Sequence, residues 1–149
     1  MPVREATPAD LDDICDLIQE HATYEGNQTL TLNRADMAEH LFGPQPWAAV
    51  LIAEPPDRPG TTAGFALWHN TFSTWAAQPG IWLDDLFVRA GYRGYGLGRE
   101  LLAELRCRTD GRVEWEVRWG NTSAEGFYRS LGAHPVDGWT RYRWNVPAG

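Results

Sequence analysis

The sequence predicts a mixed α/β fold (an α+β mixed sheet) built as a single domain over residues 1–149. Three observations support this prediction. The length of 149 residues is that of one ordinary domain, and 43% hydrophobic residues are enough for one core. Apolar positions recur with helical spacing in some segments and alternate with polar ones in others. In chain order these segments predict β, α, α, β, β, β, α, β, α, β, with no internal repeat and no linker.

The first half is expected to hold a short strand, two helices and a β-hairpin. Thr7-Pro8-Ala9-Asp10 begins the first helix, because it offers a capping hydroxyl, a proline at the first helical position and a carboxylate at the third. The other expected elements are a strand at 3–6, a loop at 24–32, a helix from Asn33 to about Phe42, and strands at 47–53 and 63–69 joined by a turn at 55–60.

The second half is expected to alternate strands and helices. Val113, Trp115, Val117 and Trp119 alternate with charged residues, which is the period of a half-buried strand. The remaining elements are a loop at 72–80, a strand at 81–88, helices at 98–109 and 122–131, and a closing strand at 139–146.

Composition excludes several classes of function. All 13 basic residues are Arg, so the chain has neither the lysine of a P-loop nor a Schiff-base lysine. The net charge of −7 argues against nucleic-acid binding.

Cys15 and Cys107 are isolated and the four His are scattered, so no disulfide framework and no metal site are expected. The apolar runs are too short to span a membrane and no signal peptide is apparent, so we expect a cytoplasmic protein.

A glycine-rich turn between a strand and a helix is the segment most typical of ligand binding. Such a turn directs backbone N–H groups and a helix N-terminus at one spot, as a phosphate requires. A dinucleotide fingerprint starting at Gly94 would need a glycine where Arg99 stands, and a P-loop would need a lysine. The pattern that fits is R-x-x-G-x-G, Arg93 through Gly98.

Together with other segments, this pattern resembles the GCN5-related N-acetyltransferase (GNAT) superfamily over nearly the whole chain, and in particular its diamine, polyamine and thialysine N-acetyltransferase branch. The segments that carry the resemblance are Tyr24-Glu25, Phe72–Trp75, Ile81–Val88, Arg93–Gly98, and Asn121 with Phe127–Ala133. The resemblance implies a GNAT fold, a central and mostly antiparallel sheet that splays between its fourth and fifth strands, with helices on its flanks.

The resemblance also implies that acetyl-CoA binds as co-substrate in the gap between those strands, with no metal. The pantetheine arm would pair with one strand like an added strand, and the glycine loop would hold the pyrophosphate. The implied cofactor-binding residues are Leu86, Phe87, Val88, Arg93, Gly94, Tyr95, Gly96, Leu97, Gly98, Arg99, Asn121 and Tyr128. Residues 89–112 carry a net charge of +3 and the rest of the chain −10, which predicts a basic cofactor segment in an acidic body.

The implied reaction needs a proton acceptor and a proton donor. An alkylamine with a pKa of about 10.4 arrives protonated at neutral pH and must lose a proton before it attacks a thioester. By the resemblance Asp84 accepts that proton, directly or through water, and Tyr128 protonates the departing thiolate. The family usually has Glu where Asp84 stands, one methylene longer. By strand alternation we expect Asp84 and Asp85 on opposite faces.

The implied partner is a small cationic amine, and the implied assembly is a homodimer, with no nucleic acid and no membrane. The nominated amine-binding residues are Tyr24, Glu25, Trp75, Asp84, Glu114 and Glu116. Polyamine-specific relatives have Asp where Ser73 stands, which favours a short diamine or a thialysine-like amino acid over a long polyamine. The alternative is a catalytically silent acyl-CoA-binding or regulatory module.

Overall fold

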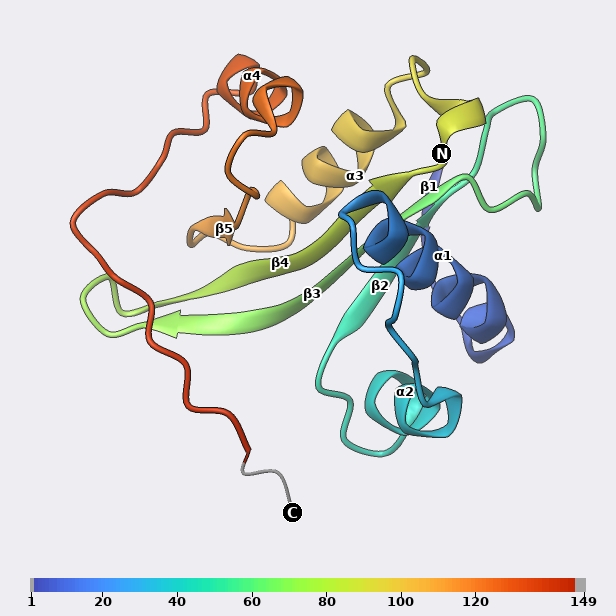
Figure 1. Ribbon diagram of the computed structural model, residues 1–149, viewed down its shortest axis with the longest axis horizontal. Helices are drawn as coiled ribbons and strands as arrows, with labels where there is room; N and C mark the ends of the chain where they lie inside the picture. The colour runs from blue at the N-terminus through green and yellow to red at the C-terminus, as the bar shows by residue number, and fades with distance from the viewer. Residues whose placement is uncertain (1, 147–149) are drawn as a thin grey trace. The chain divides into compact units, whose positions relative to one another are not determined.

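The first unit of the molecule is built on one five-stranded sheet. The computed structural model describes residues 2–146, and they divide into two compact units, Met1–Trp115 and Glu116–Gly149. The strands lie in the order β1-β2-β3-β4-β5, antiparallel except for the parallel pair β4 and β5 (Figure 1). Their bounds are β1 Val3–Glu5, β2 Ala49–Ala53, β3 Gly64–Ser73, β4 Gln78–Val88 and β5 Val113–Trp115. The predicted mixed sheet is therefore confirmed.

Helices flank the sheet on both faces. In the first unit they are the short 3-10 helix η1 (Pro8–Asp10), α1 (Leu11–Tyr24), α2 (Arg34–Phe42), the 3-10 helix η2 (Ala90–Tyr92) and α3 (Leu97–Arg106). The second unit contains α4 (Thr122–Ser130). None of the helices within residues 2–146 combines the length and the apolar composition needed to cross a bilayer.

A charged pair fixes the start of α1. The carboxylate of Asp10 accepts hydrogen bonds from both terminal nitrogens of Arg4, at 2.8 and 2.9 Å, and from the backbone N–H of Thr7 at 2.7 Å. Asp10 is 8% exposed. The Arg4 guanidinium therefore holds the pKa of the Asp10 carboxyl below its ordinary value, against the opposing effect of burial. This contact joins β1 to the helix entry, so the predicted helix start is confirmed.

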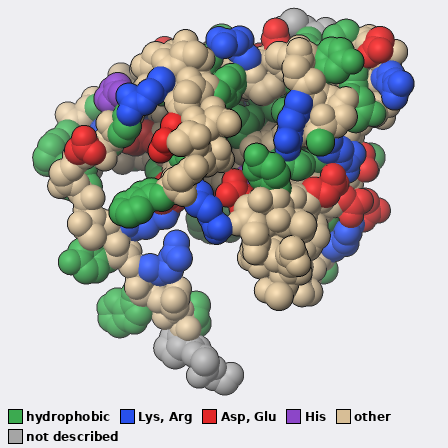
Figure 2. Space-filling view, turned by 45° about the horizontal axis from the view of Figure 1, so that its top comes forward, with side chains coloured by type: hydrophobic (Ala, Val, Ile, Leu, Met, Phe, Trp, Pro, Cys, Tyr) green, Lys and Arg blue, Asp and Glu red, His purple; other side chains and the backbone are tan. Residues whose placement is uncertain are grey.

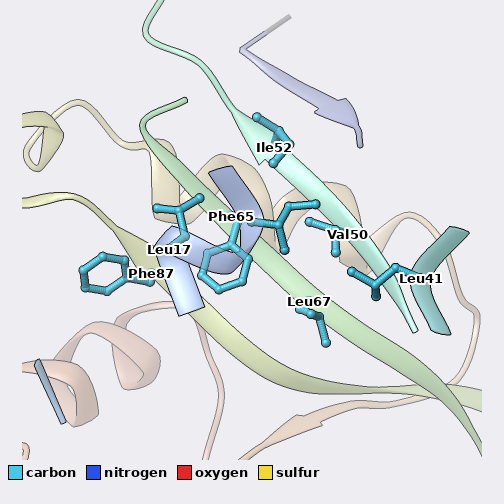
Figure 3. Close-up of a cluster of buried hydrophobic side chains, with 8 residues drawn as sticks. Leu17, Leu41, Val50, Ile52, Phe65, Leu67 and Phe87 are labelled. Atoms are coloured by element: carbon cyan, nitrogen blue, oxygen red, sulfur yellow. The ribbon is translucent and has the colours of Figure 1, made fainter. Parts of the chain in front are cut away.

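One side of the sheet buries its apolar residues under α1 and α2. Leu17 of α1 packs with Phe65 and Leu67 of β3 and Phe87 of β4 (Figure 3). Ile14 of α1 belongs to the same cluster. The cluster is completed by Leu41, Val50 and Ile52. Phe65 and Leu67 are two residues apart, and the register places Phe65 opposite Phe87, so these side chains define one face of the sheet.

The opposite face is covered by α3. Leu97, Leu101 and Leu105 are at most 2% exposed, and the next residue of β3, Trp68, has the Arg108 guanidinium 5.6 Å from its ring centroid. Because side chains alternate along a strand, Trp68 lies on the face away from Leu67. The helix predicted at 98–109 is confirmed over Leu97–Arg106.

The loop expected at 72–80 is instead the tip of a long hairpin. β3 runs to Ser73 and β4 begins at Gln78, with Phe72 opposite Pro79. The Oγ of Ser73 accepts a hydrogen bond from the N–H of Ala76 at 3.2 Å, and Ala77 has a φ of 53°. The prediction was wrong because ladder hydrogen bonds to an adjacent strand override weak local strand preference.

The strands expected near the C-terminus are shorter or absent. The strand predicted at 113–119 ends at Trp115, and residues 139–146 form no strand in the described part of the chain. Trp139, Tyr142 and Trp144 are 74%, 93% and 99% exposed. Aromatic residues favour a strand, but a strand also needs a partner for its backbone groups. Here, the prediction of a closing strand was wrong.

We predict that Asp10→Asn lowers the free energy of unfolding at pH 7 by about 1–2 kcal/mol, because Arg4 loses its charged partner. The lowered pKa of Asp10 means that the contribution is present above an unfolded-state pKa of about 3.9 and is lost as pH falls through the folded-state value. Urea unfolding should therefore show the gap between the two proteins closing in acid. The exposed Asp57→Asn is the control; an equal loss in that variant would contradict the assignment.

Candidate active site

The centre of the site is a β-bulge in β4. In the β3–β4 register, Trp68 lies opposite Leu83 and Leu67 lies opposite Asp85. Asp84 is therefore an extra residue in β4 that has no paired residue in β3. Such a residue interrupts the alternation of side chains along the strand. Asp85 thus shares the face of Leu67, the α1 face. Asp84 follows Leu83 of the α3 face and so also points to the α1 side. The expectation that the two carboxylates lie on opposite faces was wrong.

Each of these carboxylates contacts a histidine. Asp84 Oδ2 lies 2.8 Å from Nδ1 of His69 in β3, and Asp85 Oδ1 lies 3.0 Å from Nδ1 of His21 in α1. His69 is two residues beyond Leu67 and therefore lies on the same face. Glu25 adds a third carboxylate, with its Oε1 3.6 Å from Nε2 of His21. The bulge thus gathers three carboxylates and two imidazoles on one side of the sheet.

Sequence reasoning missed both histidines. His21 lies 64 residues from Asp85, and His69 lies 15 residues from Asp84. Neither distance matches a local motif, and only the strand register and the bulge bring the pairs together. Within residues 2–146 no group of three His, Cys, Asp or Glu side chains has the geometry to hold a metal ion.

An aromatic stack joins α1 to the end of β4. The rings of His21 and Phe87 stack with centroids 5.3 Å apart, and the ring of Tyr24 lies 6.1 Å from that of Phe87. The Arg93 guanidinium lies 5.0 Å from the Tyr24 centroid and 5.6 Å from that of Phe87, and its Nε donates to the carbonyl of Val88 at 2.9 Å. Arg93, predicted to bind a phosphate, therefore also anchors the glycine loop to the sheet.

The C-terminal half of β4, beyond Leu83, presents backbone hydrogen-bonding groups at the edge of the sheet. β4 pairs with β5 only from Ile81 to Leu83, and within residues 2–146 no strand pairs with that side of β4 beyond Leu83. The N–H of Arg89 donates to Ala63 on the β3 side at 2.8 Å. By alternation, the backbone groups of Leu86 and Val88 point to the opposite, open side. This is the geometry that an added strand requires.

The glycine loop needs glycine for backbone reasons. Gly94 and Gly96 have φ values of +87° and +78°, and a Cβ built at either position meets no atom within 4 Å. Gly96 precedes α3, whose first residues are Leu97, Gly98 and Arg99, and the first intrahelical bond runs from Glu100 N–H to the Gly96 carbonyl at 3.0 Å. The first N–H groups of an α-helix have no partner within the helix itself, so this position is suited to an anion. Tyr95 in this loop is 66% exposed.

The arginines around this loop do not converge on one basic pocket. Arg89 binds Glu20 at 2.8 Å and Arg108 binds Glu5 at 2.8 Å, while Arg106 donates to the Gly111 carbonyl and Arg112 to the Ser73 hydroxyl. The contact with Glu20 raises the pKa of Arg89. Figure 2 likewise shows acidic and basic side chains interspersed on the visible face. Two of the six arginines are therefore paired with carboxylates, and two more bind neutral protein groups.

The other residues nominated for amine binding in the first unit are spread along the sheet. Trp75, at the tip of the β3–β4 hairpin, is 88% exposed, and Tyr24, at the end of α1, is 59% exposed. Glu114 of β5 lies opposite Trp82 and thus on the His69 face, with Oε1 3.8 Å from Nε of Arg112. The structure brings Glu25 to His21, the histidine that also contacts Asp85, and leaves Trp75 at the hairpin tip.

Three predicted residues belong to the second unit. The Asn121 side chain caps α4 by accepting a hydrogen bond from Ala124 N–H at 3.2 Å. Tyr128 is half-buried on α4, with its ring centroid 5.5 Å from that of Phe127. Glu116 forms a two-pronged ion pair with Arg141.

Comparisons with known proteins agree on one family. The Acetyltransferase (GNAT) family profile matches residues 11–133. The chain is 30% identical to the human Spermidine/spermine N(1)-acetyltransferase-like protein 1 over 96% of its length, but spans only 22% of that protein. It is 29% identical to the Thialysine N-epsilon-acetyltransferase of Bos taurus, covering 98% of this chain and 93% of that one. It is 26% identical to the L-ornithine N5-acetyltransferase of Arabidopsis thaliana, covering 92% and 81%.

A solved structure shows the same fold. The crystal structure of a possible acetyltransferase from Clostridium difficile 630 superimposes with a TM-score of 0.81 over 98% of this chain and 97% of that one, at 20% sequence identity. At this identity the likeness supports the fold alone.

We predict that Gly94→Ala and Gly96→Ala each cost about 1–2 kcal/mol of stability, because an alanine at positive φ is strained. Gly91→Ala in the same loop is the matched control. Its φ is not in the left-handed region, and an added Cβ also meets nothing within 4 Å, so it should be neutral within about 0.5 kcal/mol. Urea unfolding measures all three, and equal losses would contradict a backbone origin.

Proposed function

The chain belongs to the Acetyltransferase (GNAT) family and is an acetyl-CoA-dependent N-acetyltransferase, and from this membership we propose that its acceptor is a small cationic amine. The preferred acceptors would be a short diamine or an amino acid with a side-chain amine. The observation that carries the proposal is the cluster of Asp84, Asp85 and Glu25 on one face of the sheet beside the glycine loop.

The first unit fits acetyl-CoA through its backbone. We assign the pantetheine arm to the open side of Leu86–Val88, where no strand pairs with β4 in the described part of the chain and where Arg93 already binds the Val88 carbonyl. We assign the pyrophosphate to residues 93–99, through the N–H groups of the first turn of α3. Because most nearby arginines are engaged with protein groups, these amides would supply much of the binding to the phosphates.

The acidic cluster suits an ammonium ion. Carboxylates raise the local concentration of a cation and orient it. Ser73 stands where polyamine-specific relatives have Asp, which favours a short acceptor. Among the relatives, the printed names include thialysine and ornithine acetyltransferases, both of which denote amino acids with a side-chain amine.

The proposed reaction releases two protons from the amine. The ammonium first gives one to the carboxylate–histidine cluster at Asp84, and the free amine attacks the thioester carbonyl carbon. As the C–S bond breaks, the thiolate takes a proton from the hydroxyl of Tyr128. The Tyr128 oxygen then recovers a proton from the acylated nitrogen. The net products are the amide, the free thiol and one proton in solvent.

The main test is thiol release from acetyl-CoA with a panel of amines. We expect turnover with short diamines and thialysine-like amino acids, and a loss of about 100-fold or more in kcat for Tyr128→Phe. The exposed Tyr142→Phe is the matched control. Since the chain has no lysine, thiol release without added amine cannot come from acetylation of its own lysine side chains.

Two outcomes would contradict these assignments. A Tyr128→Phe rate within twofold of the parent would remove the proton-donor role. Protection by acetyl-CoA in a thermal melt without turnover on any amine would instead support the silent acyl-CoA-binding module.

Acceptor recognition has its own test, a comparison of putrescine with n-butylamine. Glu25→Gln should raise KM for the diamine by about 10-fold, because a second ammonium loses a charged partner, and leave KM for the monoamine nearly unchanged. Equal effects on both amines would contradict charge recognition. A far higher kcat/KM for spermidine than for short diamines would contradict the preference for a short acceptor.

Three further expectations stay predictions from the sequence. They are a homodimer, a cytoplasmic location and a single-domain organisation. Sedimentation of the full chain would test the first of them.

A further inference from the structure

We propose that Nε2 of His69, rather than the Asp84 carboxylate itself, accepts the proton of the amine, and that Asp84 is the positioning residue for His69. This inference rests on the proposed function and deepens it. It reassigns the role that the family resemblance gives to the carboxylate position.

The hydrogen bond between the two side chains determines the tautomer of His69. An ionised carboxylate only accepts hydrogen bonds, so the His69 Nδ1 that lies 2.8 Å from Asp84 Oδ2 must carry the proton. In a neutral imidazole the other nitrogen, Nε2, then holds a lone pair. The His69 side chain is 42% exposed, and within residues 2–146 its Nε2 has no hydrogen-bond partner. The basic nitrogen is thus accessible to an acceptor amine.

The chemistry favours an imidazole over a carboxylate in this place. A free imidazole has a pKa of about 6.5 and a free aspartate about 3.9, against about 10.4 for an alkylammonium. Proton transfer to an imidazole is therefore less uphill by about 2.6 pKa units. An imidazole also extends the reach of a carboxylate that is one methylene shorter than the glutamate usual in the family.

The second histidine of the cluster, His21, has no such accessible basic nitrogen. His21 has Asp85 Oδ1 at 3.0 Å from Nδ1 and Glu25 Oε1 at 3.6 Å from Nε2, so carboxylates lie beside both nitrogens. Its side chain is only 17% exposed and its ring stacks on Phe87. We therefore assign proton transfer to His69 and a structural position to His21.

The proposed step balances. The ammonium N–H bond breaks, its electron pair stays on nitrogen, and the proton forms an N–H bond at His69 Nε2. The resulting imidazolium is stabilised by the Asp84 carboxylate, and it returns the proton to solvent after the acetyl group has moved.

The experiment compares variants of the full chain on the best amine of the panel. His69→Asn keeps an amide N–H near the Nδ1 position, where it can still hold Asp84, but it lacks the basic nitrogen. We expect its kcat/KM to fall by about 100-fold or more, while protection by acetyl-CoA in a melt stays at the parent level. Added imidazoles should restore His69→Ala, with rates that rise with the basicity of the imidazole. The double variant Asp84→Ala/His69→Ala should be no slower than His69→Ala.

The exposed His40→Ala on α2 controls for unspecific effects of imidazole. If His69→Asn stays within about threefold of the parent while Asp84→Asn loses about 100-fold or more, the carboxylate is itself the proton acceptor and the inference is overturned. A failure of imidazoles to restore His69→Ala also overturns it, and both outcomes leave the proposed function intact. A parent protein that acetylates no amine overturns the inference and the proposed function together.

Discussion

The arrangement of the site depends on one extra residue in β4. If side chains alternated without interruption after Leu83, Asp85 and Phe87 would face the leucines of α3, where an unpaired carboxylate would cost several kcal/mol. The bulge at Asp84 instead returns Phe87 to the cluster under α1 and brings Asp85 to His21. The bulge at Asp84 therefore has two effects: it places Phe87 in the core under α1, and it places the charged groups on the same face of the sheet. The stability of this face and the chemistry of the site both depend on this one β-bulge.

Local signals predicted the parts of the molecule that depend on local physics. The helix start at Thr7-Pro8-Ala9-Asp10 and the helices expected from Asn33, at 98–109 and at 122–131 depend on residues a few positions apart. Each appears close to where it was expected. Features that need a partner strand were not predictable. The extension of the β3–β4 hairpin through Phe72, the bulge and the lack of a strand at 139–146 all depend on which backbone groups find partners.

The site shows the same division. The carboxylates and the glycine loop stand out in the sequence, because their residue types and spacing are informative. The histidines do not, because a contact over 64 residues leaves no local pattern. The net positive charge of residues 89–112 also did not predict a basic pocket, because Glu20 and Glu5 pair with Arg89 and Arg108, and Arg106 binds a backbone carbonyl. Arginines of this segment brace the fold around the loop as much as they create a positive field.

The open side of β4 has a consequence for solubility. An unpaired strand edge is a template on which another chain can extend a sheet, and natural proteins cover or disrupt such edges to avoid aggregation. Here the edge beyond Leu83 must stay accessible if a ligand is to bind along it. The Arg93 side chain, which occupies the Val88 carbonyl, narrows the exposed stretch. A ligand lying along Leu86–Val88 would cover the rest and would thereby block the pairing of this edge with another chain.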